Sequence, residues 1–279
     1  MNKYRLKEII EQTLQEDIGT GDVTTESLIP PSIPANGRFL AKSAGILAGL
    51  PVAEFAFMTL DSSLEFQTYF QDGDKIKPGD VIAQVSGAAR SLLCGERVSL
   101  NFLQRLSGIA TLTGKFVEAS RLYRVRIVDT RKTTPGLRML EKYAVRQGGG
   151  SNHRFGLYDA VLIKDNHLAA LKGNIKEAVR LARENSPHTI TVEVETTDEE
   201  QVKEALAAGA DIIMLDNMPV AEMKRMVELI NRKALVEASG NVTLENVAEI
   251  AACGVDIISV GALTHSAPAL DISLEMEVG

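Results

Sequence analysis

The stretch that decides the fold is "ITVEVETTDEEQVKEALAAGADIIMLDN", residues 190–217. It opens with the apolar, β-branched run "ITVEVE", continues with the amphipathic segment "DEEQVKEALAAG" and closes with a second run, "IIMLDN". Short β-branched runs are typical of strands, and apolar residues spaced three and four apart are typical of a helix. Thr197 and Glu200 match a capping box, and Gly209 lies where a helix C-cap belongs. The stretch therefore predicts a strand–helix–strand unit.

The same alternation extends in both directions along the second half of the chain. Further strand-like runs are "VRIVDT" (125–130), "AVLIKD" (160–165), "ALVEASG" (234–240) and "IISVG" (257–261). Helical patterns separate them, and "AAGADIIML" (207–215) is echoed 45 residues later by "ACGVDIISV" (252–260). Strands that alternate with helices indicate a parallel sheet with both faces covered. We expect a closed or partly closed α/β barrel, with a doubly wound open sheet as the competing architecture.

The first hundred residues follow a different pattern. Short strand-like runs are broken by Gly, Pro and Asp, as in "DKIKPGDVIAQVSG" (74–87), which predicts a smaller α+β domain. From Arg97 to Tyr123 a long helical pattern joins the two parts.

Composition narrows the class of protein. The 279 residues carry a net charge of −7, which argues against a general nucleic-acid binder. The N-terminal 17 residues form a charged amphipathic pattern, not a signal peptide, and the most apolar stretch contains Pro51 and Glu54. Cys94 and Cys253 match no metal or redox spacing. We expect a soluble cytoplasmic protein without a membrane or nucleic-acid partner.

Against this acidic background, residues 131–154 contain six Arg or Lys residues and one acid. A block of positive charge confined to so short a segment indicates a small anionic ligand. Arg138, Lys142 and Arg146 follow helical spacing, however, and a solvated helix face is the favoured interpretation for these three.

Chargeable or small residues close each strand-like run. They are Asp129, Arg131, Lys132, Lys164, Asp165, Glu193, Glu195, Asp216, Asn217, Glu237, Ser239, Ser259 and Gly261. In α/β barrels the active site lies at the carboxyl ends of the strands. The last two strand ends, "ASGN" and "SVGA", are small residues that enter helices, as phosphate sites do. Cations, carboxylates and a phosphate cup together fit a phosphorylated substrate with Mg²⁺, although a Glu on a barrel strand can equally pair with a Lys inside the barrel.

Nine segments carry a resemblance to the quinolinate phosphoribosyltransferase family, also called nicotinate-nucleotide pyrophosphorylase (carboxylating). They are "EDIGTGDVTT" (16–25), "GERVSLNFLQRLSGIAT" (95–111), "DTRKTTPGLRMLEKYAV" (129–145), "SNHR" (151–154), "IKDNH" (163–167), "VEVE" (192–195), "MLDN" (214–217), "EASGN" (237–241) and "SVGALTHSAPALD" (259–271). The resemblance implies synthesis of nicotinate mononucleotide from quinolinate and phosphoribosyl pyrophosphate, with release of pyrophosphate and CO₂, in de novo NAD biosynthesis.

The resemblance also implies an architecture. It predicts an N-terminal α/β sandwich domain (1–107), an incomplete α/β barrel (108–267) and a C-terminal segment (268–279) that packs back on the N-terminal domain. It further implies a homodimer or higher even oligomer in which the partner's N-terminal domain completes each barrel.

Site residues follow from the same resemblance. Quinolinate is assigned to five side chains, with Arg97 acting from the partner subunit: Arg97, Arg131, His153, Arg154 and Lys164. Lys132, Glu195 and Asp216 are assigned as catalytic residues. Lys132 is placed between the substrates, and Glu195 and Asp216 hold Mg²⁺ and the ribose. The 5′-phosphate cradle is assigned to Ser239, Gly240, Gly261 and His265. Asn241 departs from the family pattern, since some relatives have a second glycine there.

Two other functions fit some of the residues. A Schiff-base lyase would use Lys132 or Lys164 as a nucleophile at a strand end. A non-catalytic binder of nucleotides or oxyanions would use the same cations without turnover. The complete set of carboxylates and cations favours the transferase over both.

Overall fold

The computed structural model describes residues 1–278, and the chain divides into two compact units. Unit 1 comprises residues 1–114, 133–149 and those from 264 onward; unit 2 comprises residues 115–132 and 150–263. The domain limits expected from the sequence stay a prediction. No helix among the described residues is long and apolar enough to cross a membrane.

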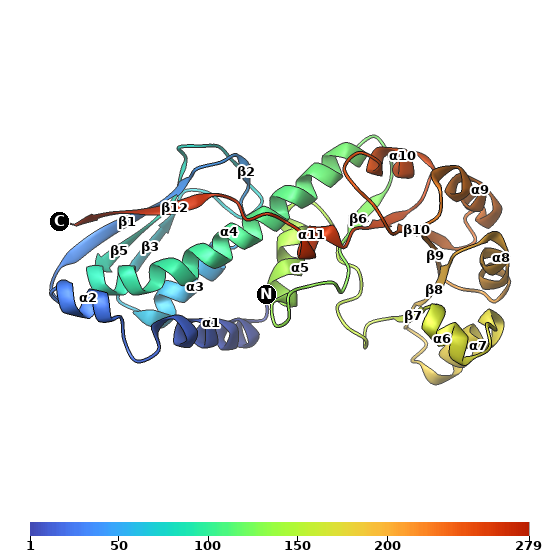
Figure 1. The fold of residues 1–279 in the computed structure, drawn as a ribbon, viewed down its shortest axis with the longest axis horizontal. Helices are drawn as coiled ribbons and strands as arrows, with labels where there is room; N and C mark the ends of the chain where they lie inside the picture. The colour runs from blue at the N-terminus through green and yellow to red at the C-terminus, as the bar shows by residue number, and fades with distance from the viewer. Residues whose placement is uncertain (279) are drawn as a thin grey trace. The chain divides into compact units, whose positions relative to one another are not determined.

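Unit 1 is built on a four-stranded antiparallel sheet in the order β12-β1-β5-β3. These strands are β12 (Ile272–Val278), β1 (Pro34–Ala41), β5 (Val81–Ala88) and β3 (Glu65–Thr68). Residues of β1 alternate between exposed and buried, as expected for a sheet with one covered face. In Figure 1, β12 (red) runs beside β1, and the register pairs Ala41 with Ile272. The predicted return of the C-terminal segment to the N-terminal domain is therefore confirmed.

Helices complete unit 1, together with the short pair β2 (Gly45–Ile46) and β4 (Lys75–Ile76). The helices are α1 (Lys3–Ile18), α2 (Val23–Leu28), α3 (Leu50–Leu60), α5 (Arg138–Gln147) and the first part of α4 (Ala89–Ser120). The aromatic rings of Phe39, Phe57 and Phe66 lie within 6.2 Å of one another, centroid to centroid, in the core. The long helix predicted from Arg97 thus begins earlier, at Ala89.

Helix α5 corrects the interpretation of the basic block as a solvated face. Lys142 is only 1% exposed, and the neighbouring Glu141 is fully buried. Glu141 accepts hydrogen bonds from the Arg105 guanidinium of α4 and from the N–H of Thr134. Tyr143 donates a hydrogen bond to Asp72 at 2.7 Å. Burial is the larger cause and this hydrogen bond the second cause of the raised pKa of its hydroxyl. Arg146 alone of the three basic residues is exposed, so the helix is held on several sides.

Unit 2 is a six-stranded parallel sheet in the order β6-β11-β10-β9-β8-β7. The strands are β6 (Arg126–Val128), β7 (Val161–Ile163), β8 (Val192–Thr196), β9 (Ile212–Asp216), β10 (Leu235–Ser239) and β11 (Ile257–Ser259). Each strand from β7 to β11 pairs with the next, and β11 pairs back to β6, so β6 and β7 are the sheet edges. A doubly wound sheet would reverse its strand order at a switch point. The connectivity is that of the predicted incomplete barrel.

The helices of unit 2 alternate with these strands. They are α6 (Asp165–Ala170), α7 (Ile175–Asn185), α8 (Glu199–Ala207), α9 (Val220–Ile230) and α10 (Val247–Ala252), with α11 (Ala262–His265) at the boundary between the units. Figure 1 shows α7, α8 and α9 lying along the strands that they connect. The predicted capping box is wrong by one residue, because Asp198 accepts the Gln201 N–H and Gln201 accepts the Thr197 N–H. Gly209 adopts φ +79° after α8, as predicted.

The internal echo has a structural counterpart at the amino ends of the strands. Asp211 accepts the N–H of Val192 at 2.7 Å, and Asp256 accepts the N–H of Val236 at 2.9 Å. Each aspartate therefore fixes the start of the neighbouring strand through a charge-assisted hydrogen bond. The repeated residues stabilise the end of the sheet away from the predicted site.

Candidate active site

Strand register places the predicted polar residues on one face of the parallel sheet. Glu195 of β8 pairs with Met214 of β9, and Asp216 of β9 pairs with Ser239 of β10. Since side chains two residues apart share a face, Glu195, Asp216 and Ser239 point to the same side at the carboxyl ends of the strands. Ile163 pairs with Val194, so Lys164 follows directly beside Glu195.

Lys164 and Glu195 form an ion pair, with Nζ and Oε2 2.8 Å apart. The Lys164 side chain is 44% exposed and that of Glu195 only 13%, so the pair is open at its lysine end. The pairing of a strand Glu with a barrel Lys, weighed from the sequence, is thus present. It also leaves a cation and a carboxylate at the site edge, where an anionic substrate can compete for Lys164.

Arg131 and Arg154 form the cationic part of this edge, and both are half-buried. Burial, and then the positive charge of Arg131, lower the pKa of the Arg154 guanidinium. Its Nη1 donates to the carbonyl of Ala160 at 3.0 Å, which fixes the head group. Two guanidiniums held within electrostatic reach of each other repel, and an anion bound between them relieves that repulsion.

The loop after β10 has the backbone geometry of a close-approach site. Gly240 adopts φ +89°, and a Cβ there would lie 2.2 Å from Oδ1 of Asn217. Asn241 also has positive φ, which explains why glycine suits this position, and its Nδ2 donates to Asn217 Oδ1 at 2.9 Å. Asn217 in turn donates to Asp216 Oδ2 at 2.8 Å. The Asn217 amide therefore links the Asp216 carboxylate to the predicted phosphate loop, a role that the sequence did not indicate.

The predicted entry of both small-residue strand ends into helices is only partly correct. Gly261 stands directly before α11, but α10 begins only at Val247, well after Ser239. A loop with two consecutive left-handed residues, Gly240 and Asn241, occupies the intervening position. Its backbone N–H groups, not a helix terminus, are the donors that a phosphate would meet there.

The remaining predicted residues are spread over the two units. Lys132 is exposed in the segment after β6, and its backbone N–H donates to Thr130 Oγ1 at 3.1 Å. Arg97 is exposed on α4, and the His265 ring contacts Ser266 Oγ at 2.6 Å. Arg97 and His265 belong to unit 1 and the other predicted residues to unit 2. Their approach to the sheet edge stays a prediction.

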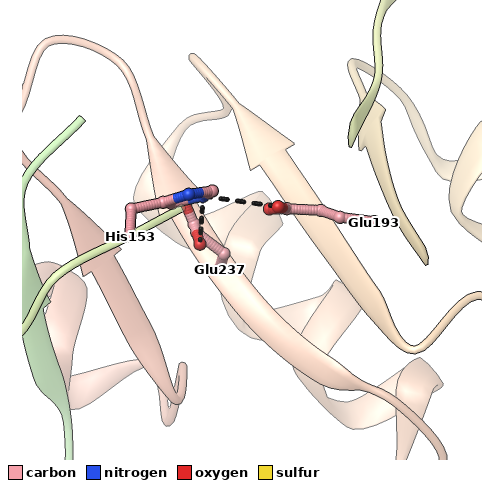
Figure 2. Close-up of side chains that lie close together, drawn as sticks. All are labelled: His153, Glu193 and Glu237. Atoms are coloured by element: carbon pink, nitrogen blue, oxygen red, sulfur yellow. Dashed lines mark ion pairs between the residues drawn. The ribbon is translucent and has the colours of Figure 1, made fainter. Parts of the chain in front are cut away.

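A buried ionic cluster lies two residues below the carboxyl ends of the strands, on the same face of the sheet (Figure 2). His153 Nε2 is 3.3 Å from an oxygen of Glu193 on β8 and 3.5 Å from an oxygen of Glu237 on β10. The glutamate side chains are 3% and 1% exposed, and each keeps one buried oxygen without a hydrogen-bond partner. Both glutamates stood among the strand-end residues of the sequence, but nothing in the sequence indicated what they do.

Electrostatics within this cluster keep a proton between the ring and the carboxylates. Burial by itself lowers the pKa of His153, but Glu193 and Glu237 outweigh it and raise the pKa to about 10. Nδ1 accepts the N–H of Arg154 at 2.7 Å, so in the neutral ring the proton lies on Nε2. The carboxylates favour a ring that is protonated at both nitrogens, whereas the Arg154 N–H favours an unprotonated Nδ1. In both cases Nε2 carries a proton.

Among the described residues, two groups are candidates for holding a metal. The ligand atoms of His153, Glu193 and Glu237 lie within 4.8 Å of one another, but the imidazole there already serves as the ion-pair partner of both carboxylates. Glu195 and Asp216 offer carboxylates from adjacent strands at the open edge. Mg²⁺ keeps several waters and takes one or two carboxylates plus substrate oxygens. Glu195 and Asp216 fit that ion better than the buried cluster does.

Family models match almost the whole chain. Residues 22–107 match the N-terminal domain model of quinolinate phosphoribosyl transferase, and residues 109–275 match the C-terminal domain model. A probable nicotinate-nucleotide pyrophosphorylase (carboxylating) of Bacillus subtilis (strain 168) is 48% identical, over 99% of this chain and 95% of the relative. The chloroplastic nicotinate-nucleotide pyrophosphorylase of Arabidopsis thaliana is 47% identical, over 98% and 83%.

Solved structures agree with these relatives. NadC from Streptococcus pyogenes superposes with a TM-score of 0.96 at 41% identity, covering 100% of this chain and 99% of that one. The nicotinate-nucleotide pyrophosphorylase from Francisella tularensis gives a TM-score of 0.93 at 38% identity, covering 99% and 98%. At 41% and 38% identity these proteins share much of their sequence with this chain as well as the fold.

Proposed function

Because the chain belongs to the quinolinate phosphoribosyltransferase family and carries that activity of NAD biosynthesis, we propose that its substrates are quinolinate and phosphoribosyl pyrophosphate. The products are nicotinate mononucleotide, pyrophosphate and CO₂. The observations that carry this proposal are the two half-buried guanidiniums of Arg131 and Arg154 and the Lys164–Glu195 ion pair, whose Nζ and Oε2 lie 2.8 Å apart. Guanidiniums bind carboxylates through two parallel hydrogen bonds, so two of them suit a dicarboxylate.

Quinolinate occupies the cationic end of the site. Arg131, His153, Arg154 and Lys164 surround its two carboxylates, and Lys164 exchanges part of its contact with Glu195 for a substrate oxygen. In a site of low dielectric constant, two anionic substrates repel each other strongly unless cations compensate their charge. The local basic block supplies that compensation within a chain of net charge −7.

Phosphoribosyl pyrophosphate occupies the other end. Ser239, Gly240 and Gly261 present backbone and hydroxyl donors to its 5′-phosphate, with His265 completing the cradle. Glu195 and Asp216 flank the ribose, where their charge favours the positive character that develops at the anomeric carbon. Lys132 lies between the two substrates.

Glu195 and Asp216 would also hold Mg²⁺. When bound, this ion offsets the charge of the pyrophosphate group. The pair of carboxylates on neighbouring strand ends fits an ion that retains water and substrate oxygens as ligands.

The proposed chemistry has two stages. The pyridine nitrogen forms a bond to the anomeric carbon as the bond to pyrophosphate breaks and its electron pair leaves with the pyrophosphate. The quaternised ring nitrogen then accepts the electron pair of the bond to the 2-carboxylate, CO₂ departs, and the ring carbon takes a proton. Positioning and electrostatic stabilisation account for most of the acceleration.

We also propose a homodimer or higher even oligomer in which Arg97 acts on the partner's quinolinate. Its side chain is exposed on α4, which suits a role between subunits. The cytoplasmic location and the absence of a nucleic-acid or membrane partner stay predictions.

The experiment that tests the reaction measures the purified protein with quinolinate, phosphoribosyl pyrophosphate and Mg²⁺. We expect pyrophosphate and CO₂ in equal amounts, both dependent on each substrate. Pyrophosphate without CO₂ would contradict the decarboxylation stage, and the absence of both products would contradict the proposed function as a whole.

A further inference from the structure

We propose that Glu193 and Glu237 are positioning residues for the quinolinate end of the site, which act by holding the His153 ring and, through it, Arg154. This inference rests on the proposed function for the identity of the anion, but the contacts that carry it lie within unit 2 alone. Neither glutamate has a part in the chemistry described above.

The first observation is the layer in which the two glutamates lie. Glu193 precedes Glu195 by two residues and Glu237 precedes Ser239 by two, so each occupies the same sheet face one step further from the open edge. β9 lies between their strands in the sheet. His153 reaches this layer from the segment between α5 and β7 and faces both carboxylates, as Figure 2 shows.

The second observation is the cost of this arrangement. Two carboxylates that are almost fully buried need compensating charge, and each here retains one oxygen without a hydrogen-bond partner. Well-packed apolar side chains would fill the same space at lower cost. Here both carboxylates lie against the imidazole of His153 and fix its position.

The third observation connects the imidazole to the site. His153 Nδ1 accepts the backbone N–H of Arg154, while Asp129 accepts the backbone N–H of His153 at 3.0 Å. Asp129 is fully buried at the end of β6 and also accepts from the Asn152 side chain. The ring and the backbone on both of its sides are thus fixed to β6, β8 and β10.

Charge balance supports the same role. His153 Nε2 lies 3.3 Å from Glu193 and 3.5 Å from Glu237, and the next residue in the chain is a second cation, Arg154. Removing one carboxylate leaves excess positive charge in a buried position, which favours a shift of the His153–Arg154 segment toward solvent. Binding of a dicarboxylate depends on where that segment lies.

The test compares Glu193→Gln and Glu237→Gln with the wild type, using Glu228→Gln as a control on an exposed face of α9. Glutamine keeps the shape and removes the charge. We expect the KM for quinolinate to rise roughly 10- to 100-fold in both variants, the cost of a misplaced binding group. The KM for phosphoribosyl pyrophosphate should stay unchanged, although Glu195 and Ser239 are the nearer neighbours in sequence.

A second readout needs no turnover. With ¹⁵N-labelled histidine, the four histidines of the chain give separate ring signals, and His153→Asn identifies the one of interest. We expect the His153 ring to show no titration between about pH 5 and about pH 9, with Nε2 protonated throughout, whereas an ordinary histidine ring titrates near pH 6.5. In Glu193→Gln/Glu237→Gln the ring should titrate as an ordinary histidine.

The outcomes separate this inference from the proposed function. Suppose that the wild type converts quinolinate, and that in the glutamine variants the KM values for both substrates rise equally or neither changes. The positioning role is then wrong and the proposed function stands. If the wild type is inactive while Nε2 keeps its proton, the proposed function fails and the ionic cluster stands. Loss of the Nε2 proton signal on addition of Mg²⁺ or Zn²⁺ would identify a metal site and overturn the inference.

Discussion

Lys132 is the residue whose predicted role is least explained by local structure. It is exposed, and its backbone N–H donates to Thr130 Oγ1. The proposed role places its charge between two anionic substrates, and truncation of an exposed side chain usually has little effect on stability. Lys132→Ala should therefore lower kcat by roughly 100- to 1,000-fold, as loss of one charge-stabilising group does, and leave the thermal midpoint unchanged. Lys233→Ala, another exposed lysine, is the matched control; wild-type turnover in Lys132→Ala would remove Lys132 from the mechanism.

His153 carries a pH dependence whose sign follows from its surroundings. Glu193 and Glu237 raise its folded-state pKa to about 10, above the ordinary value, against the opposing effect of burial. A raised pKa stabilises the fold fully below about pH 6.5, and that stabilisation is lost as pH rises toward 10. The wild type should therefore exceed His153→Gln in stability by roughly 2–4 kcal/mol at pH 6 and by much less at pH 9.5. Chemical denaturation at both pH values measures the difference; a constant gap would contradict the ion pairs.

Among the elements, the loop after β10 gives the clearest prediction. Gly240 needs positive φ and has no room for a Cβ beside Asn217. Gly240→Ala should cost about 1–3 kcal/mol in stability and raise the KM for phosphoribosyl pyrophosphate, because Asn217 and Asp216 move with it. Gly209→Ala is the control, since Gly209 has similar φ but open space around it. Gly209→Ala should lose stability without any change in the KM for phosphoribosyl pyrophosphate. An equal change in this KM for both variants would contradict a special role for the loop.

The elements also mark the limit of what sequence predicts. The strands were predictable because β-branched runs and turn signals are local features. The start of α8 was misplaced because Thr197–Glu200 and Asp198–Gln201 both match a capping box, and only the backbone decides between them. The basic helix was misjudged because Lys142 is buried by contacts that helical periodicity cannot reveal. The roles of Glu193 and Glu237 required the register of β8 and β10 with β9.

At the scale of the molecule, alternation of strands and helices predicted the barrel connectivity, and the resemblance predicted the return of the C-terminal strand to the first sheet. The location of the barrel opening between β6 and β7 needed the strand pairing. An opening of this kind is consistent with the proposed completion of the barrel by a second subunit.

That idea predicts complementation between subunits. Arg97→Ala and Lys132→Ala should each be nearly inactive alone. If Arg97 acts on the partner's site, a mixed dimer of the two variants contains one site with both residues intact. Mixing after reversible dissociation should then restore activity that neither variant has by itself. A mixture as inactive as its components, with mixed dimers demonstrated by native mass spectrometry, would place Arg97 in its own subunit's site or in none.

The most direct measurement compares quinolinate with nicotinate as the acceptor, each with phosphoribosyl pyrophosphate and Mg²⁺. The two pyridines differ by the one carboxylate that the paired guanidiniums of Arg131 and Arg154 are proposed to bind. We predict nicotinate mononucleotide and CO₂ from quinolinate and no product from nicotinate. Equal conversion of both pyridines, or of nicotinate alone, would contradict the claim that this basic edge recognises a dicarboxylate.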